Sequence, residues 1–167
     1  MQPPNYTHCP FCGETLQQRD DHGETRKYCP KDNWTYYPRV ATSAVAIVLK
    51  DNHILLVQRN IEPHKETWMC PSGFIEYGEH PEEAIRREVL EETGLAVTTI
   101  ELTGVDQAQD EREPGHFVFA YKVSTKPGEL KTDARENQAI QWFDIANLPE
   151  IAWPTQRLAL KRLGILK

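Results

Sequence analysis

The stretch from residue 81 to residue 94, PEEAIRREVLEETG, constrains the fold of this chain more than any other. Pro81 suits the first turn of a helix, because the N–H that it lacks would have no partner within the helix. Gly94 suits the left-handed position just past a helix end. Glu82 and Glu83 suit the first turn, where the helix dipole favours acids. The stretch therefore predicts a helix that begins at Pro81 and ends before Gly94.

The second half of this predicted helix is crowded with acids. Glu91 and Glu92 stand at the end where the dipole favours cations, and like charges three and four residues apart repel. Together with Glu88 they span roughly 100° of one face, which also carries apolar residues and so points partly inward. Carboxylates beside a core need a compensating charge, and hard oxygen ligands suit Mg²⁺ or Mn²⁺. The alternative is a solvated acidic helix whose glutamates pair with Arg86 and Arg87.

The chain divides into two unequal parts, residues 1–37 and residues 38–167. In the second part, hydrophobic alternation and apolar runs predict five strands and a second helix besides the one described above. The strands are expected at 41–49, 53–59, 95–105, 116–124 and 139–145, and the second helix at 154–165. Strands mixed with two helices imply an α/β or α+β core. Cys70, between Met69 and Pro71, is expected in a core strand as a buried small hydrophobe.

Residues 1–37 hold three of the four cysteines and almost no aliphatic residues, so this segment needs a cross-link such as a bound metal or a disulfide to fold. A Cys-x2-Cys pair is followed after 16 residues by a second pair whose last cysteine is replaced by aspartate. This spacing is typical of a zinc ribbon. The predicted zinc ligands are Cys9, Cys12, Cys29 and Asp32. His8 and His22 are alternative fourth ligands, since Zn²⁺ accepts histidine as readily as aspartate.

Two other interpretations of the cysteine segment stay open. A ribbon that binds no metal would fold by packing on the domain that follows it. A redox Cys-x-x-Cys is the other alternative, but no thioredoxin-like βαβ pattern surrounds the pair.

The net charge of -6 argues against a surface that coats long nucleic acid and against a polybasic membrane patch. No apolar run approaches the roughly 18 residues of a membrane span, and the N-terminus has no apolar core of the signal-peptide kind. A cytoplasmic protein is therefore expected. In that compartment structural disulfides are rare, which favours metal binding by the clustered cysteines.

The stretch SGFIEYGEHPEEAIRREVLEETGL (72–95) resembles the Nudix box, G-x5-E-x7-R-E-U-x-E-E-x-G-U, where U is a bulky aliphatic residue. Gly73 and Glu79 occupy its first two fixed positions. The remaining fixed positions are met by Arg87, Glu88, Val89, Glu91, Glu92, Gly94 and Leu95. The preceding WMCPSGF resembles the family's W-x-x-P-G-G-F, with Ser72 in place of the first glycine. The resemblance implies an α/β/α sandwich and hydrolysis of a nucleoside diphosphate linked to a second moiety.

The resemblance also implies roles for single residues. Glu88 and Glu92 would be the main ligands of a catalytic Mg²⁺ or Mn²⁺, with help from Glu91 and from the backbone carbonyl of Ser72. Glu79 would pair with Arg87 and hold the loop onto the helix. Glu136, six residues before Trp142, is a candidate further ligand or base, or else a solvated loop acid. Glu111 and Glu113 are weaker candidates for the same role.

The combination of a zinc ribbon with this box resembles a subfamily of ADP-ribose and FAD pyrophosphatases, through residues 58–68 and 148–160 as well. The resemblance implies an ADP-linked substrate cut to AMP and a phosphate ester. Three aromatic residues are candidates to stack an adenine, although each can equally belong to the core: Phe117, Tyr121 and Trp153. The ribbon also suggests a homodimer.

The same box is compatible with other functions. The NADH pyrophosphatase group carries S-Q-P-W-P-F-P-x-S after it, where this chain has GVDQAQDEREPGHF. Hydrolysis of nucleoside triphosphates or of an RNA 5′ pyrophosphate is a second alternative. A non-catalytic ligand-binding module is a third, although all three box glutamates that would bind metal are present.

Overall fold

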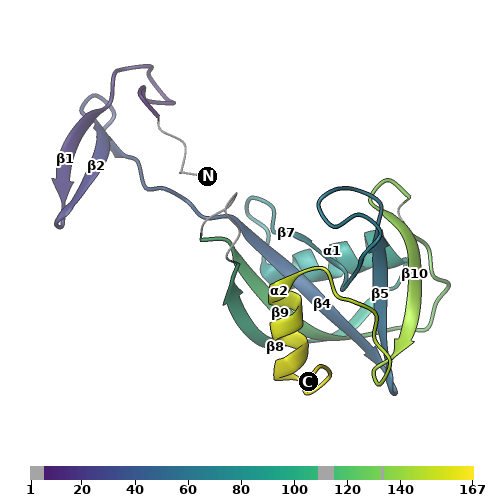
Figure 1. Cartoon of the computed structure of the whole chain (residues 1–167). Helices are drawn as coiled ribbons and strands as arrows, with labels where there is room; N and C mark the ends of the chain where they lie inside the picture. The colour runs from purple at the N-terminus through teal and green to yellow at the C-terminus, as the bar shows by residue number, and fades with distance from the viewer. Residues whose placement is uncertain (1–5, 109–114, 133) are drawn as a thin grey trace.

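A computed structural model describes residues 6–108, 115–132 and 134–167 of the chain. Figure 1 shows a small N-terminal sheet joined by an extended linker to a larger body of strands and helices. The N-terminal sheet has the order β1-β2-β3 and is antiparallel throughout. Its strands are β1 (Gln17–Asp21), β2 (Glu24–Cys29) and β3 (Trp34–Thr35).

The larger body is built on a mixed sheet in which five main strands have the order β10-β5-β4-β9-β8. Only the central pair β4 and β9 is parallel, and two short strands extend the sheet, β6 beside β5 and β7 beside β4. The strands are β4 (Thr42–Lys50), β5 (His53–Arg59), β6 (Trp68–Met69), β7 (Ser72–Phe74), β8 (Val97–Gln107), β9 (Phe117–Thr125) and β10 (Asn137–Asp144). The helices are α1 (Pro81–Thr93) and α2 (Pro154–Arg162).

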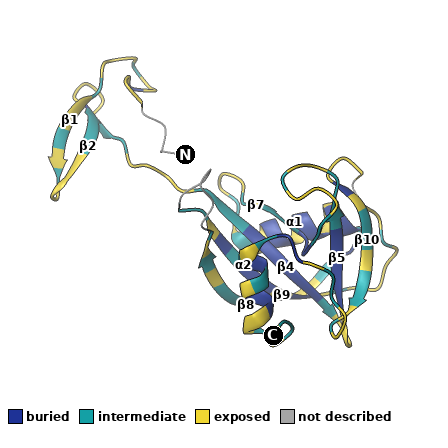
Figure 2. Ribbon diagram, viewed as in Figure 1, coloured by how far each residue is buried: buried dark blue, intermediate teal, exposed yellow. Residues whose placement is uncertain are grey.

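The two helices cover opposite faces of this sheet because the strands bury side chains on both sides. In β4, Ala44 and Ala46 belong to the apolar cluster under α1, while Val45 and Ile47 belong to the cluster under α2. Successive side chains of a strand point to opposite faces, so this near-continuous apolar run serves two cores. The predicted α/β/α sandwich is confirmed, and Figure 2 shows the buried residues concentrated in it.

The predicted helix of the acidic stretch is confirmed at both ends. It begins at Pro81, and Gly94 follows it with a φ of 75°, the left-handed conformation expected of that glycine. His80 caps the start, accepting a hydrogen bond from the Glu82 N–H, while the Glu83 side chain accepts one from the His80 N–H. This reciprocal capping box fixes where the acidic face begins.

Other element boundaries differ from the sequence-based ones by a few residues. α2 ends at Arg162, earlier than expected, and Gly164 beyond it has a φ of 70°. β8 runs to Gln107, with one register shift near its start and one in the middle of its pairing with β9. Cys70 is fully buried as expected, but it lies in the connection between β6 and β7 rather than within a strand.

The N-terminal sheet makes few connections to the larger body. No hydrogen bond, ion pair or ring contact joins the described residues up to Tyr37 with those after Arg39. Figure 2 shows most of this sheet exposed or half-buried, and Cys9 and Cys29 are its buried apolar residues. Across the described residues, no helix is long and apolar enough to span a membrane.

Candidate active site and cysteine cluster

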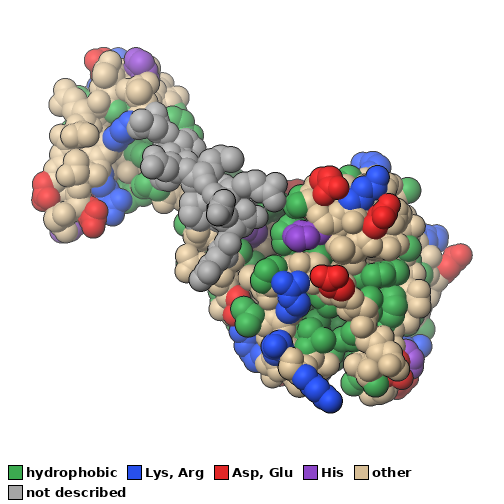
Figure 3. Space-filling model, in the orientation of Figure 1, with side chains coloured by type: hydrophobic (Ala, Val, Ile, Leu, Met, Phe, Trp, Pro, Cys, Tyr) green, Lys and Arg blue, Asp and Glu red, His purple; other side chains and the backbone are tan. Residues whose placement is uncertain are grey.

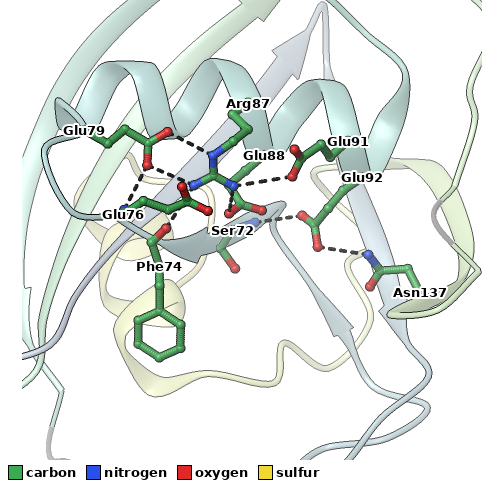
Figure 4. A network of polar contacts seen from close by, with 9 residues as sticks. All are labelled: Ser72, Phe74, Glu76, Glu79, Arg87, Glu88, Glu91, Glu92 and Asn137. Carbon is green, nitrogen blue, oxygen red and sulfur yellow. Dashed lines mark hydrogen bonds and ion pairs between the residues drawn. The ribbon is translucent and has the colours of Figure 1, made fainter.

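Arg87 lies in the middle of α1, and its side chain reaches back to the loop that precedes the helix. Its Nε and Nη2 donate to the two oxygens of Glu79 at 2.9 and 3.0 Å, a bidentate pairing that fixes both side chains. Nη2 also donates to the Phe74 carbonyl at 3.0 Å (Figure 4). Hydrogen bonding to Arg87 lowers the pKa of Glu79, so this carboxylate is ionised and serves as an anchor.

The same guanidinium reaches toward the acidic face of the helix. Arg87 Nη1 donates to Glu88 at 2.5 Å and to Glu91 at 3.3 Å. Glu88 is buried at 8% exposure, whereas Glu91 is exposed. Arg87 therefore holds Glu88 beside the loop and also contacts Glu91 at the surface.

Glu92 is the most buried acid of the group, with 3% of its surface exposed. The Ser72 N–H donates to its Oε2 at 2.8 Å, and Asn137 Nδ2 donates to its Oε1 at 2.9 Å. Burial raises the pKa of Glu92 to about 8 and also raises the pKa of Glu88. A bound cation would reverse this shift, because it favours the ionised form of both carboxylates.

Gly73 lies against the acidic helix so closely that no side chain fits. A Cβ atom at this position would stand 1.9 Å from Glu88 Oε1. The glycine is therefore required by the approach of the carboxylate and not by a left-handed φ, which Gly73 does not have. Ser72 also lies outside the left-handed region, which explains why serine can replace the glycine that is usual there.

Glu136 lies at the edge of the same group. It is exposed, directly precedes Asn137, and its carbonyl accepts the Asn60 N–H at 2.7 Å. Its charge contributes to raising the pKa of both Glu88 and Glu92, which places it close enough to act on the site electrostatically. The weaker candidates Glu111 and Glu113 lie outside the described residues.

The helix carboxylates fit a divalent ion by their chemistry, although their oxygens are not gathered into a tight cluster. Glu88 and Glu92 are buried acids beside the Ser72 backbone, and oxygen donors of this kind suit Mg²⁺ or Mn²⁺. In the described part of the chain, only the cysteine cluster brings the ligand atoms of three or more His, Cys, Asp or Glu residues within 4.8 Å of one another.

The three aromatic candidates for substrate stacking differ in accessibility. Phe117 is 37% exposed, whereas Tyr121 is 4% exposed and packs in the core under α1, so its ring is not presented to a ligand. Trp153 is half-buried, with the His64 ring edge-on at 4.6 Å and the Arg59 guanidinium 5.5 Å from its ring centre.

Phe74 is a more exposed aromatic side chain that the sequence analysis did not single out. It is 56% exposed and stacks on His116, with ring centres 5.4 Å apart and planes inclined by 20°. His116 in turn lies 2.9 Å from Ser43 Oγ. The Phe74 carbonyl binds Arg87, while the Phe74 ring points away from the carboxylates (Figure 4).

The four predicted zinc ligands come together in the N-terminal sheet. Cys9 Sγ lies 3.1 Å from Asp32 Oδ2, Cys29 Sγ lies 3.8 Å from the same oxygen, and the sulfurs of Cys12 and Cys29 are 3.6 Å apart. A sulfur separation of 3.6 Å is far longer than a disulfide bond, and all four cysteines are free. The spacing and the donor types fit a tetrahedral Zn²⁺ site.

The crowding of these groups has an electrostatic consequence. Hydrogen bonding to the Asp32 carboxylate raises the pKa of the Cys12 thiol to about 12. The Cys12 thiolate is therefore unfavourable unless a cation joins the cluster, whereas hydrogen bonds from the Asp32 backbone and from Cys12 lower the pKa of Cys29. His8 and His22 are not part of the cluster.

Two buried amides belong to the candidate active site and were missed from the sequence. Asn137 contacts Glu92, and Gln156 of α2 contacts Cys70 and Ser72. Their partners lie 45 to 86 residues away in the chain, so no local pattern connects them.

The glutamate-lined helix, packed against a glycine loop on a mixed sheet between two helices, defines the class of domain. The NUDIX domain profile matches residues 38–163. The chain therefore belongs to the Nudix family.

Named relatives extend this result. The chain is 38% identical over 125 residues to the ADP-ribose pyrophosphatase of Methanocaldococcus jannaschii, covering 73% of this chain and 72% of that protein. It is 34% identical over 146 residues to the NAD-capped RNA hydrolase NudC of Vibrio atlanticus, covering 86% of this chain and 51% of that protein. The chain thus spans about half the length of that relative.

A solved structure shares the fold. The crystal structure of a NUDIX hydrolase from Nitrosomonas europaea superposes with a TM-score of 0.73 at 22% identity, covering 93% of this chain and 89% of that one. Because residues 38–167 make up less of the chain than that coverage, the similarity extends into the N-terminal segment.

Proposed function

We propose that this protein is a Mg²⁺-dependent hydrolase that cleaves the pyrophosphate of an ADP-linked substrate, such as ADP-ribose or FAD, to AMP and a phosphate ester. One observation carries the proposal: Glu88 and Glu92, both buried, face the loop at Ser72 and Gly73 from one side of α1. Buried carboxylates need a cation, and a pyrophosphate needs the same cation to neutralise it.

In this proposal Glu88 and Glu92 are the main ligands of Mg²⁺ or Mn²⁺. Glu91, which is exposed, assists them directly or through water, and the Ser72 carbonyl completes the protein's contribution. When bound, the ion would neutralise the pyrophosphate and lower the pKa of a bound water.

Other residues of the chain orient these ligands and handle the proton. Arg87 and Glu79 lock the loop to the helix, so that the Glu88 carboxylate and the Ser72 backbone keep a fixed separation. Glu136, an exposed acid whose charge acts on Glu88 and Glu92, would accept a proton from the attacking water or bind a further ion.

The substrate class is supported by the relative named ADP-ribose pyrophosphatase, which this chain matches over most of both lengths. We assign stacking of the base to two exposed rings, Phe74 and Phe117. Trp153 is the remaining candidate, and its half-buried ring contacts His64 and Arg59.

A second candidate function is cleavage of an NAD-linked pyrophosphate, either in free NADH or at an NAD-capped RNA end. The observation that favours it is the similarity to NudC proteins, which covers 86% of this chain and so includes part of the cysteine segment. The net charge of -6 gives little support to binding of a long RNA.

The decisive experiment is release of AMP in the presence of Mg²⁺ from ADP-ribose, FAD, NADH and a nucleoside triphosphate, assayed side by side. A preference for ADP-ribose or FAD is expected. A preference for NADH would favour the second candidate. A preference for the triphosphate would contradict both, and absence of turnover in protein that binds Mg²⁺ would indicate a ligand-binding module.

The N-terminal segment, residues 1–37, is proposed to be a zinc ribbon with Cys9, Cys12, Cys29 and Asp32 as ligands. Four free cysteines fit a reducing compartment, which supports a cytoplasmic protein. Because the ribbon makes few contacts with its own body and exposes Phe11 and Tyr37, we propose that it contributes to a homodimer. Loss of the dimer mass on removal of residues 1–37 would support this assignment, and an unchanged mass would contradict it.

A further inference from the structure

The buried carboxylate of Glu92 has a neutral partner on each of its oxygens. The Ser72 N–H, from β7, donates to one oxygen at 2.8 Å, and Asn137, from β10, donates to the other at 2.9 Å (Figure 4). Asn137 is fully buried, so its amide cannot turn toward solvent. Neutral donors fix the direction of a carboxylate without discharging it, which leaves its negative charge available to a cation.

A second buried amide holds the segment that carries one of these donors. Gln156, from α2, is 2% exposed. Its Oε1 accepts the Cys70 N–H at 2.8 Å, and its Nε2 donates to Ser72 Oγ at 3.2 Å and to the Cys70 carbonyl at 3.4 Å. Gln156 thus grips residues 70–72 from the side of the sheet opposite α1.

A buried amide with satisfied hydrogen bonds can serve packing alone, and two observations argue against that simpler explanation here. The contacts of both amides converge, directly or through Ser72, on one carboxylate. In addition, Asn137 Oδ1 is buried and has no hydrogen-bond partner among the described residues. An amide kept only for packing would be expected to have its oxygen satisfied as well.

We propose that Asn137 and Gln156 are positioning residues for the catalytic metal site, acting together as an amide brace on Glu92. Asn137 would set the rotation of the Glu92 carboxylate, and Gln156 would set the position of the Ser72 N–H and carbonyl. The inference rests on the proposed function, because it gives Glu92 the role of metal ligand. Loss of a residue that orients a ligand in this way typically weakens metal binding by about 10–100-fold.

The test measures the Kd of Mn²⁺ by electron paramagnetic resonance, on the full-length protein with its zinc retained. The variants are Asn137→Ala, Asn137→Ser and Gln156→Met, the last of which keeps the volume of the side chain but loses its hydrogen bonds. Each is expected to raise the Kd by about 10-fold or more at a temperature where circular dichroism shows a folded protein. Asn137→Ser is included because a short hydroxyl fills the cavity better if the alanine variant does not fold.

Leu160→Ala is the matched control. Leu160 is fully buried on the same helix as Gln156 and packs in the apolar cluster under α2, but its side chain has no group that can hydrogen-bond to residues 70–72. It should lower the melting temperature without changing the Kd of Mn²⁺. An equal rise of the Kd in Leu160→Ala would show that the amides act only through general stability, and would overturn the proposal.

A double-mutant cycle separates this inference from the function on which it rests. If Glu92→Gln leaves the Kd unchanged, the assignment of the metal site itself is wrong. If Glu92→Gln weakens binding but the amide variants do not, only the brace is wrong. Within a Glu92→Gln background, Asn137→Ala should have no further effect on the Kd, because the side chain that Asn137 orients no longer carries the charge that would bind the ion.

Discussion

The protein has two candidate metal sites that are built in opposite ways. The carboxylate site lies on a packed sandwich, and its members are held by protein partners: Arg87 binds Glu79 and Glu88, and Asn137 binds Glu92. The cysteine cluster lies in a sheet with almost no other buried residues, and its four members contact mainly one another. The packed sandwich holds the carboxylate site in place, whereas the cysteine cluster supplies most of the buried contacts of the N-terminal sheet.

This difference implies different tasks for the two proposed metals. A site that the fold supports can exchange its ion and change its ligand contacts during a reaction without loss of structure. A cluster that supplies the core of its own segment cannot, because removing the ion removes the reason for the segment to fold. The predictions below separate the two tasks, beginning with the largest expected effect.

Removal of zinc should unfold the N-terminal sheet and leave the sandwich intact. Cys29→Ser deletes a fully buried ligand, and zinc binding by such sites is worth on the order of 10 kcal/mol, more than a segment of this size can replace. Zinc content by mass spectrometry should fall to zero, and amide NMR signals of residues 6–37 should collapse while those of residues 42–167 persist.

The matched control for this variant is Cys70→Ser. Cys70 is also fully buried, but it belongs to the apolar cluster under α2. It should destabilise the sandwich and leave one zinc per chain. A Cys29→Ser protein that kept a dispersed ribbon spectrum would show that the ribbon folds by packing and not by metal.

At the other site, loss of one ligand should abolish turnover without loss of structure. Glu92→Gln keeps the side-chain volume but removes the charge that would bind the ion. The rate of AMP release with saturating substrate should fall on the order of 10³-fold, corresponding to several kcal/mol of transition-state stabilisation. The melting temperature should not fall, because burial of this acid is itself unfavourable. Full Mg²⁺-dependent activity in this variant would contradict the assignment.

The sequence predicts those parts of the site that lie within one continuous stretch. The helix from Pro81 to Thr93, the pairing of Glu79 with Arg87 and the inward face of Glu88 and Glu92 depend on residues at most 13 positions apart. Helical geometry decides which residues of α1 share a face, whereas the pairing of Glu79, which precedes the helix, with Arg87 is implied by the resemblance to the Nudix box. The cysteine cluster is predictable for a related reason, since few residue types bind zinc and their spacing is characteristic.

The remainder of the site depends on contacts between distant strands and helices. Asn137 reaches Glu92 only because β10 is placed beside β5 in the sheet, and Gln156 reaches Ser72 only because α2 crosses the far face. Neither amide carries a charge or a distinctive spacing. Similarly, Tyr121 and Phe117 both belong to β9 and look alike in sequence, yet one is in the core and the other is exposed.

A smaller effect is expected when the hydrogen bonds of Arg87 to Glu79, Glu88 and the Phe74 carbonyl are weakened and the metal ligands are left unchanged. Arg87→Lys keeps the charge but cannot bind Glu79 through two parallel hydrogen bonds while also reaching Glu88 and the Phe74 carbonyl. We expect kcat/KM to fall about 10–100-fold, as for other residues that orient ligands, with a modest loss of thermal stability. Arg86→Lys is the control, because the neighbouring Arg86 makes one hydrogen bond at the surface, to the Val97 carbonyl. Equal losses of kcat/KM in both variants would mean that the effect comes from the helix surface and not from the hydrogen bonds of Arg87.

The last prediction concerns a pH dependence of stability in buffer free of Mg²⁺ and Mn²⁺. Burial raises the pKa of Glu92 to about 8, above its ordinary value of 4.5, so the folded protein holds a proton that the unfolded chain releases. The free energy of unfolding should therefore fall as pH rises from about 5 to 8, by at most about 1.4 kcal/mol per pH unit. Urea unfolding at several pH values should show a shallower decline in Glu92→Gln than in the wild type, and addition of Mg²⁺ should also flatten the wild-type curve. If the two proteins declined in parallel, the buried proton would not be on Glu92.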